Sequence, residues 1–434
     1  MKLCLLFKTI ERALTGSVFT LLFIFLPDVA SAEAGDTLLD RVFQPTIKTV
    51  LLHRDGWELS YPVITIGASE KLKLSFDELS KTRTEYRYII KHCNSDWTED
   101  DLESFEYMDS PGDNRLGQPG YSFSTYVAYV HYELVFPTAD WEFHRSGNYC
   151  ILVYEQDAKK PVFTKRFMIN ENRLDLAISI RKPGEGAEDE TMQSLDIKLG
   201  LPQNDNEHLS EIPVLVVNQN GNWYNSRTIT EPMLSGGTEI EYRLDGKDAF
   251  AGNNEFRNFD IKSVKYQSPN IENITYAENA FQIGLHVEKS RTYKPYYFDN
   301  DLNGKSYIKI TEGQNSGTDA DYLNVYFTLS LLQPLMEGKL YVTGAFCSWK
   351  TDAENCLHYN SKTGAYELIL QLKQGYYNYL YAFVKKGSRA LDFTTLEGSH
   401  FETENDYLIM AYQKDARGYD RLTGFRVFNT LNKK

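Results

Sequence analysis

The sequence lacks most of the patterns that catalysis or nucleic-acid binding would need. Its eight histidines are scattered, and no His-x-His, His-Glu-x-x-His or Cys-x-x-Cys spacing offers a metal site. No Gly-x-Ser-x-Gly segment presents a serine nucleophile. The net charge of -14 comes without a cluster of lysine and arginine, so the surface would repel the phosphates of nucleic acid. These absences predict a protein that is not an enzyme, needs no cofactor or metal and does not bind nucleic acid. A glycoside hydrolase stays a further alternative, because the sequence does not reveal which of its many carboxylates would face each other across a cleft.

Cysteine is scarce as well, with five in the chain, one of them near the N-terminus. Cys347 and Cys356 flank an eight-residue loop, which makes them a possible local disulfide. Cys93 and Cys150 fall in expected strands of one domain and could also meet. Three pairings of these four residues are possible, and free buried thiols are equally compatible with the sequence.

Long apolar runs are absent except at the N-terminus. There, Lys2, Lys8 and Arg12 precede a short apolar run from Val18 to Leu26. The small residues Ala30-Ser31-Ala32 follow, as a signal peptidase requires. The run is too short to span a membrane comfortably. We therefore expect residues 1–32 to be a signal peptide cleaved after position 32, and the mature chain to be exported and soluble.

Helical periodicity is scarce, while aromatic and β-branched runs recur between polar, glycine-rich breaks. This pattern predicts an all-β protein made of tandem immunoglobulin-like or early-set β-sandwich domains. About seven strand patterns before residue 170 favour an immunoglobulin-like sandwich over 33–170. Residues 171–335 form a central β-rich region that could hold one sandwich or two. Residues 336–434 are expected to form an early-set-like sandwich.

The segment EYRYIIKHCNSDW at residues 85–97 predicts a strand, a tight turn and an aromatic anchor. Tyr86 and Tyr88 fall on one side of the extended chain, because strand side chains alternate. Asn, Ser and Asp then favour a turn, since their side chains can bond to their own backbone. Trp97 follows as a large apolar group. We expect all three aromatic residues to be structural anchors.

A second tryptophan raises a different possibility. The pattern Gly-x-Phe-x-x-Trp ends at Trp349, and Gly-x-Tyr-x-Tyr follows from Gly375. Together these patterns are similar to the starch- and glycogen-binding modules of amylase-type enzymes. An exposed indole would offer a flat apolar face to a sugar ring, whereas a buried one would only support the sheet. The alternative function is therefore a secreted carbohydrate-binding protein, with this tryptophan as the sugar contact.

The run Asp299-Asn-Asp-Leu-Asn-Gly304 begins like a calcium-binding loop, with oxygen ligands at alternate positions. The residue that would supply the final carboxylate is Ile310, which excludes an EF-hand. A turn rich in Asn and Asp explains the same residues without a metal.

A series of segments in the same order along the chain resembles the type IX secretion system plug protein family. The resemblance covers nearly the whole mature chain. The segments are EYRYIIKHCNSDW (85–97), SFSTYVAYVHYELVFP (122–137), SGNYCILVYEQD (146–157), KRFMINE (165–171), NQNGNWYN (218–225), GNNEFRNFD (252–260), DNDLNGK (299–305), DADYLNVYFTL (319–329), LKQGYYNYLY (372–381), LEGSHFETENDY (396–407) and DRLTG (420–424).

The resemblance implies a function that the residues themselves do not display. A member of this family is expected to be a non-enzymatic plug in the periplasm, peripheral to the outer membrane and not inserted into it. Its partner would be the β-barrel translocon of the type IX system. The plug would close the periplasmic end of this channel while no substrate occupies it.

Overall fold

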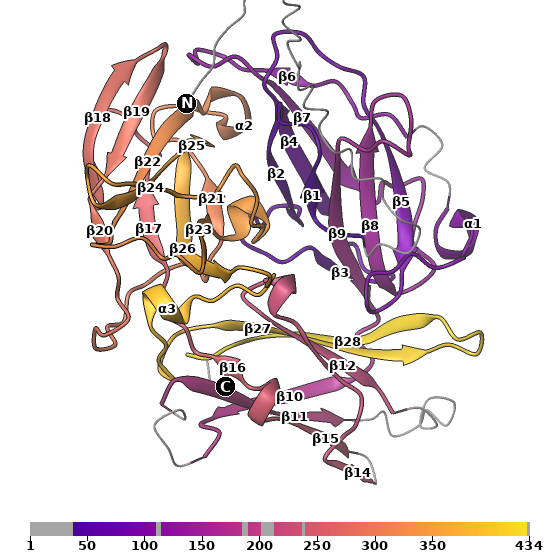
Figure 1. The fold of residues 1–434 in the computed structure, drawn as a ribbon. Coiled ribbons are helices and arrows are strands. Elements are labelled where there is room, and N and C mark those ends of the chain that lie inside the picture. Colours follow the sequence, from indigo (N-terminus) through magenta and orange to yellow (C-terminus); the bar gives the residue numbers. More distant parts are fainter. Residues whose placement is uncertain (1–37, 110–113, 185–189, 201–211, 237–238, 432–434) are drawn as a thin grey trace, which may run out of the picture. The chain divides into compact units, whose positions relative to one another are not determined.

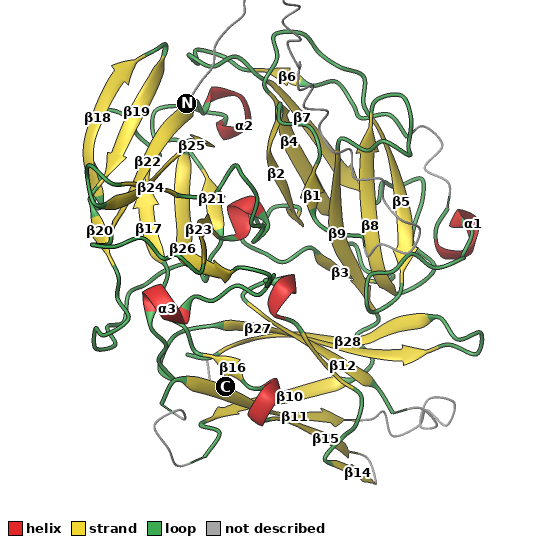
Figure 2. Cartoon of the chain, viewed as in Figure 1, coloured by secondary structure: helices red, strands yellow, loops and turns green. Residues whose placement is uncertain are grey.

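The computed structural model describes residues 38–109, 114–184, 190–200, 212–236 and 239–431. The signal peptide expected at 1–32 lies outside these residues. Within them, strands dominate, and the α-helices are single turns: α1 (Ser104–Tyr107), α2 (Ser316–Asp319) and α3 (Thr394–Glu397) (Figure 2). The prediction of an all-β protein of packed antiparallel sheets is confirmed.

Two sheets in the N-terminal part of the chain face each other. One has the order β2-β4-β7-β6, and the other has the order β1-β9-β8-β5 with β3 beside β9. Neighbouring strands are antiparallel, except that β3 runs parallel to β9. The strands are β1 (Arg41–Val42), β2 (Ile47–Arg54), β3 (Val63–Thr65), β4 (Leu72–Glu78), β5 (Arg87–Cys93), β6 (Gly120–Tyr121), β7 (Val130–Phe136), β8 (Gly147–Tyr154) and β9 (Phe163–Asn170).

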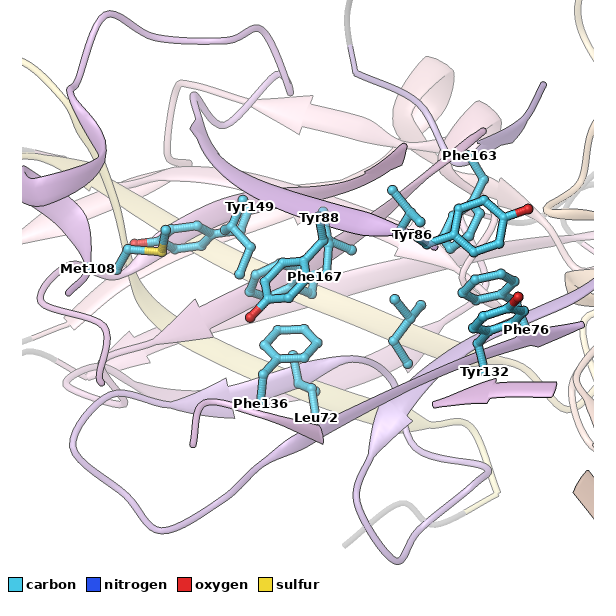
Figure 3. Packing of buried hydrophobic residues seen from close by; sticks show 14 of the residues in the cluster. Leu72, Phe76, Tyr86, Tyr88, Met108, Tyr132, Phe136, Tyr149, Phe163 and Phe167 are labelled. Atoms are coloured by element: carbon cyan, nitrogen blue, oxygen red, sulfur yellow. The ribbon is translucent and has the colours of Figure 1, made fainter. Parts of the chain in front are cut away.

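Aromatic rings fill the space between these two sheets (Figure 3). Phe76 of β4 stacks on Tyr132 of β7, with ring centroids 4.9 Å apart. It also meets Tyr86 edge-on at 5.4 Å and Phe163 of β9 at 4.8 Å. Offset and edge-to-face contacts of this kind add to the free energy gained from burying the rings. Alternate positions of each strand thus supply one shared core.

Strand β8 is buried on both of its faces, since all eight of its residues are buried. Tyr149, Ile151 and Val153 point into the core between the two N-terminal sheets. Cys150 and Leu152 point the other way, into a second core. An uninterrupted apolar strand is typical of a sheet covered on both sides. The sheet that contains β8 therefore packs against a further sheet.

That further sheet has the order β13-β12-β27-β28 and joins distant parts of the chain. Leu408, Met410 and Tyr412 of β27 lie in the core shared with β8. Ile409 and Ala411 lie in a third core, on the opposite face. The strands are β12 (Val214–Gln219), β13 (Arg227–Ile229), β27 (Asp406–Lys414) and β28 (Asp420–Asn429), which cross below the N-terminal sheets in Figure 1.

The third core is closed by a sheet of order β10-β11-β15-β14, with β16 paired to β11. Leu195 and Ile197 of β11 and Tyr242 of β15 face the sheet that contains β27. The strands are β10 (Asp175–Arg181), β11 (Met192–Gly200), β14 (Leu234–Gly236), β15 (Glu239–Leu244) and β16 (Phe250–Ala251).

Two more sheets enclose a separate core between residues 257 and 396. One has the order β17-β26-β21 with β23 beside β26, and the other has the order β18-β19-β22-β25-β24 with β20 beside β22. Their strands are β17 (Arg257–Asp260), β18 (Ile271–Ala277), β19 (Ala280–Leu285), β20 (Glu288–Lys289), β21 (Ser306–Ile308), β22 (Tyr322–Ser330), β23 (Gly338–Thr343), β24 (His358–Asn360), β25 (Ala365–Lys373) and β26 (Gly375–Lys385).

Strand pairing crosses the domain boundary expected at residue 335. β22 pairs with β25 over nine residues, and β12 of the central region pairs with β27 near the C-terminus. The division into 33–170, 171–335 and 336–434 stays a prediction about domains, whereas these pairings define the sheets.

A buried ion pair joins the N-terminal sheets to the β22–β25 sheet. Lys373 Nζ lies 2.6 Å from Asp77 Oδ2 on β4, and both side chains are only 1% exposed. Tyr322 donates its hydroxyl to the same carboxylate oxygen at 2.7 Å, and the ring of His131 lies 2.6 Å from the other. Burial lowers the pKa of Lys373, and the adjacent Asp77 carboxylate opposes this shift. The charges are tolerable because each is paired and hydrogen-bonded.

We expect Lys373→Met to lower the free energy of unfolding by about 3–5 kcal/mol, because the Asp77 carboxylate would stay buried without its cation. Chemical denaturation of the whole chain measures this change. The double variant Lys373→Met with Asp77→Asn should recover part of the loss, since it removes both charges. Lys385→Met is the matched control, because the pair of Lys385 with Glu337 is 68% and 77% exposed. Equal effects of the two single variants would contradict this account.

Candidate functional site

The three expected anchors are all buried, but they serve two different cores. Tyr86 and Tyr88 are 2% and 4% exposed and lie between the two N-terminal sheets. Trp97 is 4% exposed and lies in the core shared with β27. The tyrosines therefore hold the first pair of sheets together, while the tryptophan contacts a sheet from elsewhere in the chain.

A tight turn after β5 directs Trp97 toward this second core. The amide of Trp97 donates to the Asn94 carbonyl at 2.9 Å, and the amide of Thr98 donates to the Asp96 carboxylate at 3.0 Å. Trp97 adopts a φ of 69°, which is uncommon for a bulky residue. The amide of Ser95 is held by the Asp420 carboxylate of β28 at 2.8 Å. The turn itself is thus tied to the neighbouring sheet.

The Trp97 ring has two neighbours that sequence reasoning did not bring together. Trp223, in the 3-10 turn η1 (Trp223–Asn225), meets it edge-on at 4.9 Å. The guanidinium of Arg166 lies over the Trp97 ring at 4.4 Å and over the Trp223 ring at 5.5 Å. The sequence contains one hint of this contact, which is Arg166 within the mainly apolar strand FTKRFMIN. An arginine that is buried in such a strand needs a carboxylate or an aromatic ring beside its charge.

A cavity of about 160 Å³ adjoins this group of side chains. It lies where the N-terminal sheets, the β27 sheet and the region around β21 meet. Aromatic and cationic side chains line it, namely Tyr61, Trp97, Arg166, Trp223, Lys305 and Trp349.

The structure corrects the possible role of Trp349 as an exposed sugar contact. The residue is 4% exposed and packs edge-on against Phe256 at 5.9 Å and Phe393 at 6.1 Å. Its amide donates to the Gly344 carbonyl at 3.0 Å across the turn η3 (Ala345–Cys347), and its φ of 59° folds the ring inward. A sugar contact at the protein surface would need an indole face that is open to solvent, and this side chain is buried.

The possible disulfide between Cys347 and Cys356 is not formed, and both residues are free thiols. Their sulfur atoms have different partners: Cys347 Sγ lies 3.3 Å from the Gly344 carbonyl, and Cys356 Sγ lies 3.7 Å from the Leu357 carbonyl. Cys93 and Cys150 are also free and buried. Burial raises the pKa of Cys93 to about 12, so this thiol stays protonated at neutral pH.

The loop that begins like a calcium site forms a turn. The Asp301 carboxylate accepts hydrogen bonds from the backbone amides of Asn303, at 2.6 Å, and of Phe256. Asn303 and Gly304 adopt φ values of 50° and 81°, as a tight turn requires. Within the described part of the chain, no group of three or more His, Cys, Asp or Glu residues is placed to hold a metal ion.

Two carboxyl groups beside this turn have raised pKa values. Glu255 is 1% exposed, and burial raises its pKa to about 7. Burial likewise raises the pKa of Asp301 to about 8, with Glu255 and Glu404 adding to the shift. Glu255 Oε1 accepts a hydrogen bond from the Glu404 amide at 3.1 Å, whereas its Oε2 has no hydrogen-bond partner in the described residues. Both groups favour the protonated form in the folded state.

The N-terminal sheets of the chain match a known protein family. Residues 47–171 match the family described as "Type 9 secretion system plug protein 1st domain". This segment runs from β2 to the end of β9. A crystal structure of a hypothetical protein from Parabacteroides merdae ATCC 43184 is similar over 91% of this chain and 100% of its own, with 29% sequence identity and a TM-score of 0.85. No protein of curated function matches the chain.

The fold and this match define an all-β protein linked to type IX secretion. Residues 47–171 thus resemble the first domain of type IX secretion system plug proteins. None of the described helices is both long and apolar enough to cross a membrane.

We expect the protein to lose stability as the pH rises from about 5 to about 8. The folded-state pKa values of Glu255 and Asp301 lie above their ordinary values of 4.5 and 3.8, so the folded state binds more protons in this range. Their contribution to the free energy of unfolding is fully present below the ordinary pKa values of 4.5 and 3.8. It is lost as the pH rises through the folded-state pKa values of about 7 and about 8. His131, whose pKa is raised by its bonds to Asp77 and Glu133, acts in the same direction.

Urea unfolding between pH 5 and pH 8.5 measures this dependence. Glu255→Gln should flatten the curve, because an amide does not titrate. A wild-type stability that rises over the whole interval, or a slope that the variant leaves unchanged, would contradict the assignment.

Trp97→Ala should lower the free energy of unfolding by about 3–5 kcal/mol, because it opens a cavity between two sheets. Thermal and chemical unfolding of the whole chain measure the change. Trp57→Ala is the control, since Trp57 is 58% exposed and should have little effect. Similar small effects of both variants would show that Trp97 does not hold the β8 sheet against the β27 sheet.

Proposed function

We propose that this protein closes the periplasmic end of the type IX outer-membrane translocon when no substrate occupies the channel. The observation that carries the proposal is the match of residues 47–171 to the first domain of the plug family. On this proposal the protein acts in the periplasm, after removal of residues 1–32, and is peripheral to the outer membrane. Its partner is the β-barrel of the translocon, and its role involves no catalysis.

The internal construction of the protein suits this role. A plug has to keep its form while it blocks a wide aqueous channel, and it must also leave again. Shared hydrophobic cores and the buried pair of Lys373 with Asp77 join the sheets. A reversible contact with the translocon then calls for an interface of roughly 1,200–2,000 Å² with a polar rim.

The negative charge of the chain predicts how binding to the translocon should depend on salt. The chain carries a net charge of -14, so docking on a complementary surface would be accelerated by electrostatic attraction. Raised salt should therefore slow association more than it speeds dissociation.

The carbohydrate-binding alternative has no comparable support. It depended on an exposed Trp349, and that ring is buried, as are Tyr377 and Tyr379 of β26 at 3% and 2% exposed.

Deletion of the gene should make the outer membrane permeable to bulky hydrophilic solutes, because the channel would remain without its stopper. Solute entry is measured in four strains: wild type, plug deletion, channel deletion and the double deletion. Leakage is expected only where the channel is present and the plug is absent. The tagged protein should also co-purify with the barrel from detergent-solubilised outer membrane. Normal impermeability of the plug deletion, together with absence of co-purification, would refute the proposal.

A further inference from the structure

The cavity of about 160 Å³ beside Trp97 is lined by side chains from three parts of the fold. Arg166 belongs to β9 of the N-terminal sheets, and Trp97 to the turn after β5. Trp223 follows β12, while Lys305 directly precedes β21. None of these lining groups is needed for the proposed blocking of a channel, and the interior of a rigid stopper would not require a cationic cavity.

Arg166 is the unusual member of this lining. It is 5% exposed, and its guanidinium lies over both the Trp97 and the Trp223 ring, which contact each other edge-on. Its Nε donates to the Leu38 carbonyl. Among the described residues, no carboxylate lies within ion-pairing distance of the guanidinium, since Asp40 binds the backbone amide of Arg166 at 2.7 Å and the Lys165 ammonium at 3.0 Å. Burial lowers the pKa of Arg166, and the nearby Asp40 carboxylate opposes this shift without bonding to the guanidinium. An anion that bonded directly to the guanidinium would therefore be stabilised.

The two lysines that line the cavity are both held in ion pairs. Lys165 and Lys305 line it together with Arg166, against the carboxylates of Asp40 and Glu58. Lys305 pairs with Asp406 at 2.9 Å and lies 4.2 Å from the centre of the Tyr61 ring. Lys165 is balanced by Asp40 and Lys305 by Asp406, which leaves Arg166 as the cation of the lining without an ion pair among the described residues.

The size and the walls of the cavity restrict the rest of the ligand. Its volume of about 160 Å³ is close to that of a dry cavity that holds one benzene ring. Aromatic faces form much of the wall, and such faces favour a flat apolar group. Arginine binds a carboxylate through two parallel hydrogen bonds, which would also orient the flat group against the aromatic lining.

We propose that this cavity is a binding site for a small aromatic carboxylate, with the carboxylate on Arg166 and the ring against the aromatic side chains of the lining. This proposal does not rest on the proposed plug function. Binding of the ligand can be measured on the isolated protein, without the translocon.

Benzoate is a suitable probe, and benzamide is its uncharged counterpart of the same shape. Three of the five tryptophans, Trp97, Trp223 and Trp349, line the cavity, so intrinsic fluorescence should report occupancy. The mature wild-type protein should bind benzoate saturably and bind benzamide at least about tenfold more weakly. Calorimetry should give one site per chain.

Arg166→Met keeps a long apolar side chain and removes the charge, so it should abolish the preference for benzoate over benzamide. Arg389→Met is the matched control, because Arg389 is exposed and far from the lining residues in sequence, and it should retain the preference. If Arg166→Met does not fold, a crystal structure of the wild-type complex with benzoate decides the question. The proposal is overturned if the wild type does not prefer benzoate, if Arg166→Met keeps the preference, or if the bound carboxylate does not contact Arg166.

Discussion

The arrangement of the N-terminal and central sheets depends on strand β27, whose two faces serve two different cores. Leu408, Met410 and Tyr412 close the core over β8, while Ile409 and Ala411 close the core over β11. Since side chains alternate along a strand, one segment of nine residues can supply both cores only if it is covered on both sides. Residues near the C-terminus are thereby required for the packing of the N-terminal sheets.

Polar contacts reinforce the apolar packing that holds β27 and β28 against other segments of the chain. The Asp406 carboxylate at the start of β27 accepts from the Tyr61 hydroxyl at 3.1 Å and pairs with Lys305 at 2.9 Å. Arg421 of β28 binds Glu171, just after β9, at 2.6 Å. These pairs are partly buried, so misplacing one partner would leave the other charge poorly solvated and unpaired. Such joints fit a protein that works as one rigid object.

The same joints produce the cavity beside Trp97. Three sheets that meet at different angles cannot fill the space at their junction completely, and the chain places two indole rings and a guanidinium there. A structural anchor and a candidate ligand site therefore share residues. Their roles can be separated by experiment, because truncating Trp97 tests packing whereas removing the Arg166 charge tests anion recognition.

Local patterns in the sequence were sufficient to predict the strands, the all-β class, the turn before Trp97 and the burial of Tyr86 and Tyr88, because alternation and turn chemistry depend only on neighbouring residues. The family resemblance also came from sequence alone, through segments in a conserved order. Sequence could not place β27 beside β12, which lies about 190 residues earlier, or cover Trp349 with Phe256 and Phe393. It also could not show that Cys347 and Cys356 stay free thiols or that the Arg166 guanidinium lies over two tryptophan rings. These features were decided by tertiary structure, because they result from contacts between segments whose separation along the chain leaves no local pattern.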